Sequence, residues 1–132
     1  MQQEGAKAGR FGDCSEQVIG ACIEVHRHLG PGLLESAYER CLAYEFRRLG
    51  LQFQRQHPVS LAYKDLFIPG GYRLDFVVER QLVLEIKAIE QLLPVHEAQL
   101  LTYLKLTNLR TGLLVNFGAA TLRQGLRRLT QK

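Results

Sequence analysis

Two strand-like segments of the sequence carry charged side chains where a buried strand would hold apolar ones. Asp75 lies in YRLDFVV, and both Glu85 and Lys87 lie in LVLEIKA. Because side chains alternate between the two faces of a strand, Glu85 and Lys87 lie opposite to Leu84 and Ile86. If the two segments pair as a hairpin, one face of the pair gathers two carboxylates and one ammonium group.

Such a cluster has two physical explanations, because an unpaired carboxylate is costly to bury. One is a half-buried salt bridge from Lys87 to Asp75 or Glu85 on a solvated sheet face. The other is a site for a hard cation, since two carboxylates about 4 to 5 Å apart suit Mg²⁺. A neighbouring lysine could then orient an attacking water or stabilise charge on a phosphoryl group. The three residues alone leave both explanations open.

The surrounding segments predict the elements that must position these residues. Helical periodicity begins at Asp13 or Ser15 and ends at LGPG, and a second helix is predicted over residues 33–49. Alternation predicts a strand over 51–63, and the PGG of KDLFIPGG predicts a turn-rich link. A hairpin of strands 72–78 and 82–88, a helix over 94–108 and a strand over 111–117 follow. The last residues, TLRQGLRRLTQK, fit a helix except for Gly125, so the predicted order is α, β, β, β, α, β.

Composition limits the chain to one compact domain. The 132 residues are 46% hydrophobic, and we expect residues 1–12 to form a flexible tail before a single domain over 13–132. No apolar run is long enough for a membrane span and the start lacks a signal peptide, so we expect a cytoplasmic protein. The formal charge of +4 permits a polyanionic partner without requiring one. Cys14, Cys22 and Cys41 share no metal-ligand spacing and are interpreted as packed thiols.

The acidic residues, taken in order, resemble a known signature. Asp75, followed on the next strand by Glu85, Ile86 and Lys87, resembles the PD-(D/E)XK nuclease signature, with Leu74 replacing its proline, which carries no ligand. The predicted αβββαβ order is also that superfamily's core, so the resemblance implies an α/β fold of the restriction-endonuclease type, with a mixed sheet flanked by helices.

A second motif makes the resemblance more specific. Gly32, Glu35 and Tyr38 are spaced as G-x-x-E-x-x-Y, and the chain is similar to the GxxExxY family of PD-(D/E)XK-like proteins over residues 18–129. The supporting stretches are VHRHLGPGLLE, RLDFVV, LEIKA, HEAQLLTYL and GLLVNFG.

The resemblance implies a role for each site residue. Asp75, Glu85 and the Ile86 carbonyl would bind Mg²⁺ or Mn²⁺, Glu35 would assist through water, and Lys87 would orient the nucleophile. Without the resemblance, Glu35 could simply favour the positive end of its helix.

Gln99 and Tyr103 are four residues apart on a predicted helix and resemble the Q-x-x-x-Y feature of RecB-like nucleases. The resemblance implies that they contact the DNA backbone or position Lys87, whereas packing against the sheet is the alternative. His26 resembles a histidine metal ligand of those nucleases, although it could equally be a core residue. Basic residues that could follow a phosphate backbone, or remain solvated, are Lys105, Arg110, Arg123, Arg127 and Arg128.

These expectations define two functions from different classes. The first is a Mg²⁺-dependent phosphodiesterase acting on nucleic acid, with DNA as the expected substrate. The second is a nuclease-like binding or assembly module that keeps the fold without cutting. The chain has no evident separate sequence-reading domain, so specificity would have to come from loops, dimerisation or a partner, and this keeps the second function open. Cutting both strands often uses two sites, which makes a homodimer plausible.

Overall fold

The computed structural model describes residues 11–132, and most of the predicted N-terminal tail (1–12) lies outside them. Helix α2 (Ser15–Leu29) begins where Asp13 accepts a hydrogen bond from the Ser15 N–H at 2.8 Å. Helix α3 (Glu35–Arg48) follows a short loop, so both predicted helices are confirmed, the second two residues shorter at its start and one at its end. Within the described residues, no helix is long and apolar enough to cross a membrane.

The sheet is mixed and has the strand order β1-β2-β3-β4-β5. Strands β1 (Phe53–Tyr63), β2 (Leu66–Val78) and β3 (Leu82–Lys87) pair antiparallel in succession. Helix α4 (Pro94–Thr107) then crosses over to β4 (Thr111–Asn116), which lies parallel to β3. The predicted α/β fold with its αβββαβ core is therefore confirmed.

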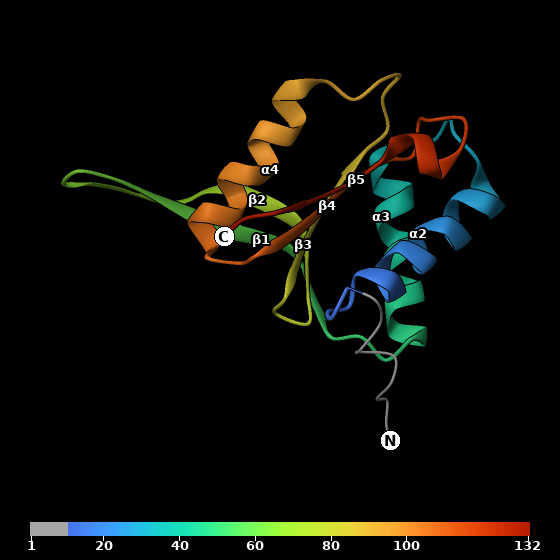
Figure 1. Cartoon of the computed structure of the whole chain (residues 1–132), viewed down its shortest axis with the longest axis horizontal. Coiled ribbons are helices and arrows are strands. Elements are labelled where there is room, and N and C mark those ends of the chain that lie inside the picture. The colour runs from blue at the N-terminus through green and yellow to red at the C-terminus, as the bar shows by residue number, and fades with distance from the viewer. Residues whose placement is uncertain (1–10) are drawn as a thin grey trace.

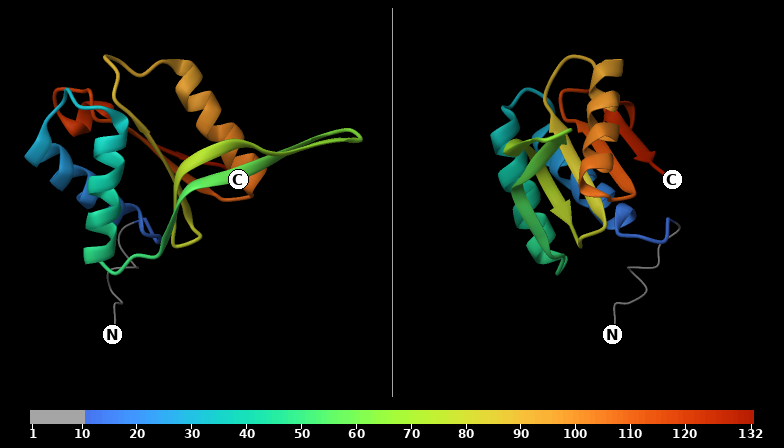
Figure 2. Two further views of the ribbon diagram at one scale, coloured as in Figure 1. Left: turned by 180° about the vertical axis from the view of Figure 1, so that it is seen from behind. Right: turned by 90° about the vertical axis from the view of Figure 1, so that its left-hand side faces the viewer.

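Two apolar clusters hold the layers together. One lies between the sheet and helices α2 and α3, and includes Tyr38, Phe46 and Phe76. The other lies between the opposite face and α4, and includes Leu74 and Leu100. Figure 1 and the right-hand view of Figure 2 show the sheet between these helices. All three cysteines are free thiols, two of them buried, as the sequence predicts.

Two segments differ from the sequence prediction. The turn-rich link predicted around PGG is part of β2, which continues as a two-stranded ribbon with β1. A register shift after Val59 accommodates the extra residues, and Gly70 there has φ of +58°. The proline of PGG is tolerated in β2 because each strand of a two-stranded ribbon forms backbone hydrogen bonds along one edge only.

The C-terminal segment, which the sequence left ambiguous, forms a 3₁₀ turn (Leu122–Gly125) and strand β5 (Leu126–Thr130) antiparallel to β4. A side chain at Gly125 would collide with the Asn116 carbonyl, so this turn requires glycine.

Candidate active site

The hairpin of β2 and β3 splits at the two acidic residues. Backbone pairing runs from Val78 and Leu82 to Phe76 and Leu84, and stops there. Beyond this point the Asp75 N–H donates to Glu85 Oε2 at 2.9 Å, and the Ile86 N–H donates to Asp75 Oδ2 at 2.7 Å. Each carboxylate therefore replaces a backbone partner, and the structure brings Asp75 and Glu85 together on one side of the sheet.

Glu85 is buried and Asp75 is half-buried, and both carboxyl groups have raised pKa values. Burial raises the pKa of Glu85 to about 8, and the adjacent charge of Asp75 adds to this. Burial also raises the pKa of Asp75, against the Ile86 N–H, and the charges of Glu39 and Glu35 add to the rise. Like charges at short range in a low-dielectric site cannot both ionise cheaply. The pair thus concentrates negative charge in a site where a bound cation would be favoured.

Lys87 lies close enough for its charge to lower the pKa of both carboxyls, but not close enough to pair with them. No salt bridge joins it to Asp75 or Glu85 in the described part of the chain, so the simple ion-pair explanation of the cluster is not observed.

The end of β3 is held firmly around this lysine. The Phe117 N–H donates to the Lys87 carbonyl at 2.8 Å, and the buried Asn116 amide bonds both the N–H and the carbonyl of Ile89. Lys87 is therefore fixed through its backbone and free to extend its side chain.

Tyr38 fixes the loop that precedes Glu35. Its hydroxyl donates to the Gly30 carbonyl at 2.6 Å and accepts from the Leu33 N–H at 3.1 Å. Its ring stacks on Phe117 with centroids 4.5 Å apart. Between the two bonded residues, Gly32 has φ of +110°, which favours glycine. Glu35 is the exposed first residue of α3, and its charge reaches both buried carboxyls.

Sequence reasoning missed a polar link from β1 and α3 to this site. Gln56 lies opposite Asp75 in β1 and has φ of +50°, rare for a residue inside a strand. Its amide donates to Glu39 Oε1 at 3.0 Å and approaches Asp75 Oδ1 at 3.5 Å. Arg55 holds the other Glu39 oxygen at 3.1 Å. No local pattern marks Gln56, because only the strand pairing brings it to Asp75.

Helix α4 brings Tyr103 to the same side. Its ring contacts Tyr72 at 6.2 Å between centroids, and burial raises its pKa, followed by the charges of Glu85, Tyr72 and Asp75. Gln99 lies one turn earlier on α4 and is exposed. Lys105 is also exposed near the end of this helix. The structure thus places Tyr103 near the carboxylates and leaves Gln99 open to solvent.

His26 has a partner outside the acidic pair. The residue is 8% exposed, and its Nε2 lies 3.0 Å from the Ala119 carbonyl. This contact joins α2 to the loop after β4, and a role in metal binding stays a prediction. Within residues 11–132 no group of three or more His, Cys, Asp or Glu side chains is placed to hold a metal. The resemblance implies a metal held directly by only two side chains, Asp75 and Glu85. The third direct ligand would be the backbone carbonyl of Ile86.

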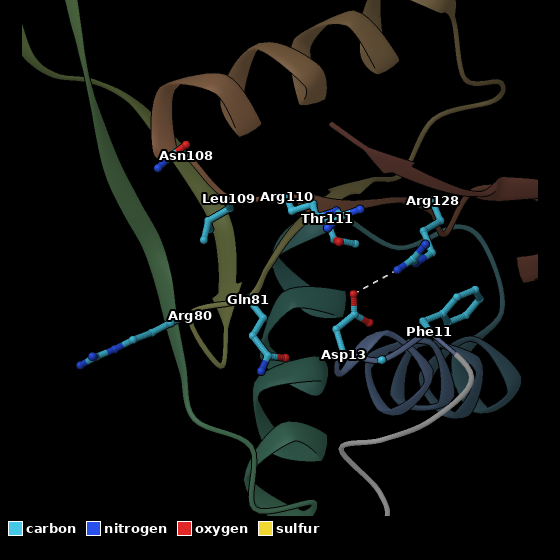
Figure 3. Close-up of a pocket in the computed structure, with 10 residues that line it drawn as sticks. Phe11, Asp13, Arg80, Gln81, Asn108, Leu109, Arg110, Thr111 and Arg128 are labelled. Carbon is cyan, nitrogen blue, oxygen red and sulfur yellow. Dashed lines mark hydrogen bonds and ion pairs between the residues drawn. The ribbon is translucent and has the colours of Figure 1, made fainter. Parts of the chain in front are cut away.

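A separate cavity of about 580 Å³ lies at the starts of β3 and β4, away from the acidic pair. Figure 3 shows Arg128 turned toward Asp13, which it bonds at 3.0 Å, while the Arg80 side chain extends away from both. Arg110 also lines this cavity, so the predicted basic residues do not converge on Asp75 and Glu85. Arg127 pairs with Glu97 at 3.7 Å, and Arg123 is exposed.

Comparison with known proteins gives one match. A family model described as the PD-(D/E)XK nuclease superfamily matches residues 12–129. No curated protein and no solved structure matches the chain.

Proposed function

The chain belongs to the PD-(D/E)XK nuclease superfamily, and from this premise we propose that it hydrolyses phosphodiester bonds of DNA with a divalent cation. The observation that carries the proposal is the adjacent pair of Asp75 and Glu85, whose pKa values are raised by burial and by neighbouring negative charges. We further propose that the chain is a GxxExxY member, a single domain over 13–132 that acts in the cytoplasm.

The residues present fit a hard cation. Mg²⁺ takes oxygen ligands and keeps several waters, so two carboxylates and one carbonyl suffice. Asp75, Glu85 and the Ile86 carbonyl would hold it, with Glu35 assisting through water. When bound, Mg²⁺ or Mn²⁺ would neutralise phosphate charge and favour ionisation of the attacking water.

Lys87 would act on the substrate directly. Its backbone is fixed by β4, and its ammonium group lies beside the carboxylates without pairing to them. It can therefore orient the attacking water for in-line displacement or stabilise charge that develops on the phosphate. Tyr103 and Gln99 on α4 would contact the DNA backbone or hold Lys87 in place. Lys105 and Arg110 would contribute salt-dependent phosphate contacts.

The experiment is cleavage of plasmid and linear DNA with Mg²⁺ or Mn²⁺. We expect Lys87→Ala to abolish cleavage and Lys132→Ala, which also removes one positive charge, to retain it. Equal cleavage by the wild type and Lys87→Ala would contradict the proposal and indicate a contaminating nuclease.

A binding or assembly module is the second candidate. It is favoured by one observation: Arg110 and Arg128 line a cavity away from Asp75 and Glu85, so a polyanion bound there would not lie at the acidic pair. Calorimetry separates the candidates. If millimolar Mg²⁺ and Mn²⁺ produce no binding heat and Asp75→Ala leaves DNA affinity unchanged, the binding module is correct.

A further inference from the structure

Strands β1 and β2 extend past the rest of the sheet as a two-stranded arm, defined here as residues 59–72. Figures 1 and 2 show this ribbon projecting away from the helices. Strand β3 pairs with β2 only from Phe76 to Val78, so no third strand among the described residues covers the arm. An isolated two-stranded ribbon is marginally stable in water, and its outer part therefore needs further support.

The arm exposes large apolar side chains on both faces. Tyr63 is 60% exposed and pairs with Leu66, which is 57% exposed; their neighbours Leu61 and Ile68 also pair, so all four share one face. Phe67, 62% exposed, points to the opposite face. An exposed apolar patch, such as the first face carries, often marks a protein–protein interaction site.

The charge of the arm indicates what kind of partner it fits. Lys64 and Asp65 are its only charged residues, and they cancel, whereas the whole chain carries +4. A nucleic-acid surface requires positive charge in its partner, and this segment offers none in excess. The arm therefore fits the surface of a second polypeptide that is itself apolar and uncharged.

We propose that the arm is the interface through which two copies of this chain form a dimer. A two-fold contact places the same surface on both sides, and an apolar surface without net charge is complementary to itself. The exposed parts of the four large side chains on one face, those of Leu61, Tyr63, Leu66 and Ile68, amount to about 350 Å² per copy, or about 700 Å² for two. Backbone and polar neighbours add to this area, which is the size of a weak, reversible interface.

The arm also connects the interface to the candidate active site. Its two strands carry Gln56 and Asp75 immediately before the ribbon leaves the sheet. Dimerisation through the arm would fix the distance between two acidic sites. The interface itself does not depend on nuclease activity, so it can be tested without DNA or metal.

The test is light scattering and sedimentation equilibrium of the full chain. We expect a species of twice the 15.0 kDa chain mass that dissociates on dilution. Replacing Tyr63 and Leu66 together by serine should weaken the dimer at least about a hundredfold. The matched control replaces Ile23 and Tyr44, which are 49% and 58% exposed on α2 and α3, and should leave the dimer intact.

Circular dichroism checks that both double variants remain folded. A wild-type chain that is monomeric over about a hundredfold range of concentration would overturn the proposal. So would a dimer that survives the arm substitutions, or one that only the Ile23 and Tyr44 substitutions break. If the arm substitutions instead reduce DNA affinity without changing the mass, the arm contacts nucleic acid and the dimer interface is refuted.

Discussion

Carboxyl groups lie near both ends of β3, and their pKa values are shifted in opposite directions. Near its start, Asp13 accepts hydrogen bonds from Arg128 and Ser15, which lower its pKa although burial acts to raise it. Near its end, Glu85 and Asp75 each accept one backbone N–H bond, Asp75 also accepts a long bond from the Gln56 amide, and burial raises both pKa values. The first group is satisfied within the protein, whereas the second pair has coordination capacity left for a ligand.

The difference teaches how to separate a structural carboxylate from a functional one. A structural carboxylate is buried together with its cation, so its charge stabilises the fold. The acidic pair is buried beside like charges from Glu35 and Glu39, so its charge destabilises the fold until a cation binds. Variants of Asp13 and variants of the acidic pair should therefore differ in activity, metal binding and stability.

The largest difference should be in activity. Asp75→Asn removes one negative charge from the proposed cation site while keeping the side-chain shape, and we expect cleavage to fall about a hundredfold or more. Asp13→Asn removes the same charge at the other end of β3 and should leave the rate per folded molecule within about twofold. Single-turnover cleavage of labelled DNA measures both. Similar losses of cleavage rate in the two variants would contradict the proposal that Asp75 is functional and Asp13 structural.

Metal binding should stabilise only a protein with an intact acidic pair. At a concentration of Mn²⁺ about 100 times its dissociation constant, the free energy of unfolding should rise by about 2.7 kcal/mol. Glu85→Gln should remove this rise, whereas Asp13→Asn should retain it. Thermal unfolding with and without Mn²⁺ provides the measurement, and a rise of equal size in Glu85→Gln would place the cation elsewhere.

The pH dependence of stability should have opposite signs at the two ends. The folded pKa of Glu85 is raised from 4.5 to about 8, so the metal-free protein should lose stability as the pH rises through this interval. Asp13 has a lowered pKa, so its contribution is present above 3.8 and is lost as the pH falls through the lowered folded value.

Glu85→Gln removes the charge that causes the first effect. We expect this variant to be more stable than the wild type by about 1 to 3 kcal/mol near pH 8 without metal. Urea unfolding across the pH range tests this. A wild-type profile that is flat between 4.5 and 8 would contradict the raised pKa.

The smallest effect should come from Gln56. Losing its amide contacts in Gln56→Ala should slow cleavage by roughly three- to tenfold. Gln56→Gly should be as slow, yet more stable than Gln56→Ala by about 1 kcal/mol, because glycine tolerates the positive φ at this position. Gln54→Ala, an exposed change in the same strand, is the control. Full activity in Gln56→Gly would show that the amide has no positioning role.

The sequence predicted much of the fold because its signals are local. Alternation around Asp75 and Glu85 indicated the hairpin, and Pro94 marked the start of α4. The prediction failed where the deciding contacts are distant. Strand β5 has too few apolar residues to identify it, and it forms because β4 offers an unpaired edge. The PGG segment looks like a link because its pairing with β1 is not visible locally.

The same distinction applies to the candidate site. Asp75, Glu85 and Lys87 share one face once their two strands pair, so their convergence could be predicted from alternation together with the short turn of the hairpin. The involvement of Gln56 and Glu39 could not, because it depends on how β1 and α3 lie against β2. The roles of Glu35, Gln99, Tyr103 and His26 rest on the resemblance and remain predictions.

The exchange of hydrogen bonds between Asp75, Glu85 and Ile86 has an evolutionary consequence. These carboxylates fasten two strands as well as serving the proposed chemistry, whereas the Lys87 side chain forms no hydrogen bond or ion pair within residues 11–132. A descendant released from selection for cutting should therefore drift first at position 87 and retain an acid or amide at 75. Degenerate copies of the protein should keep the hydrogen bonds that join β2 and β3 after the lysine at position 87 has been lost.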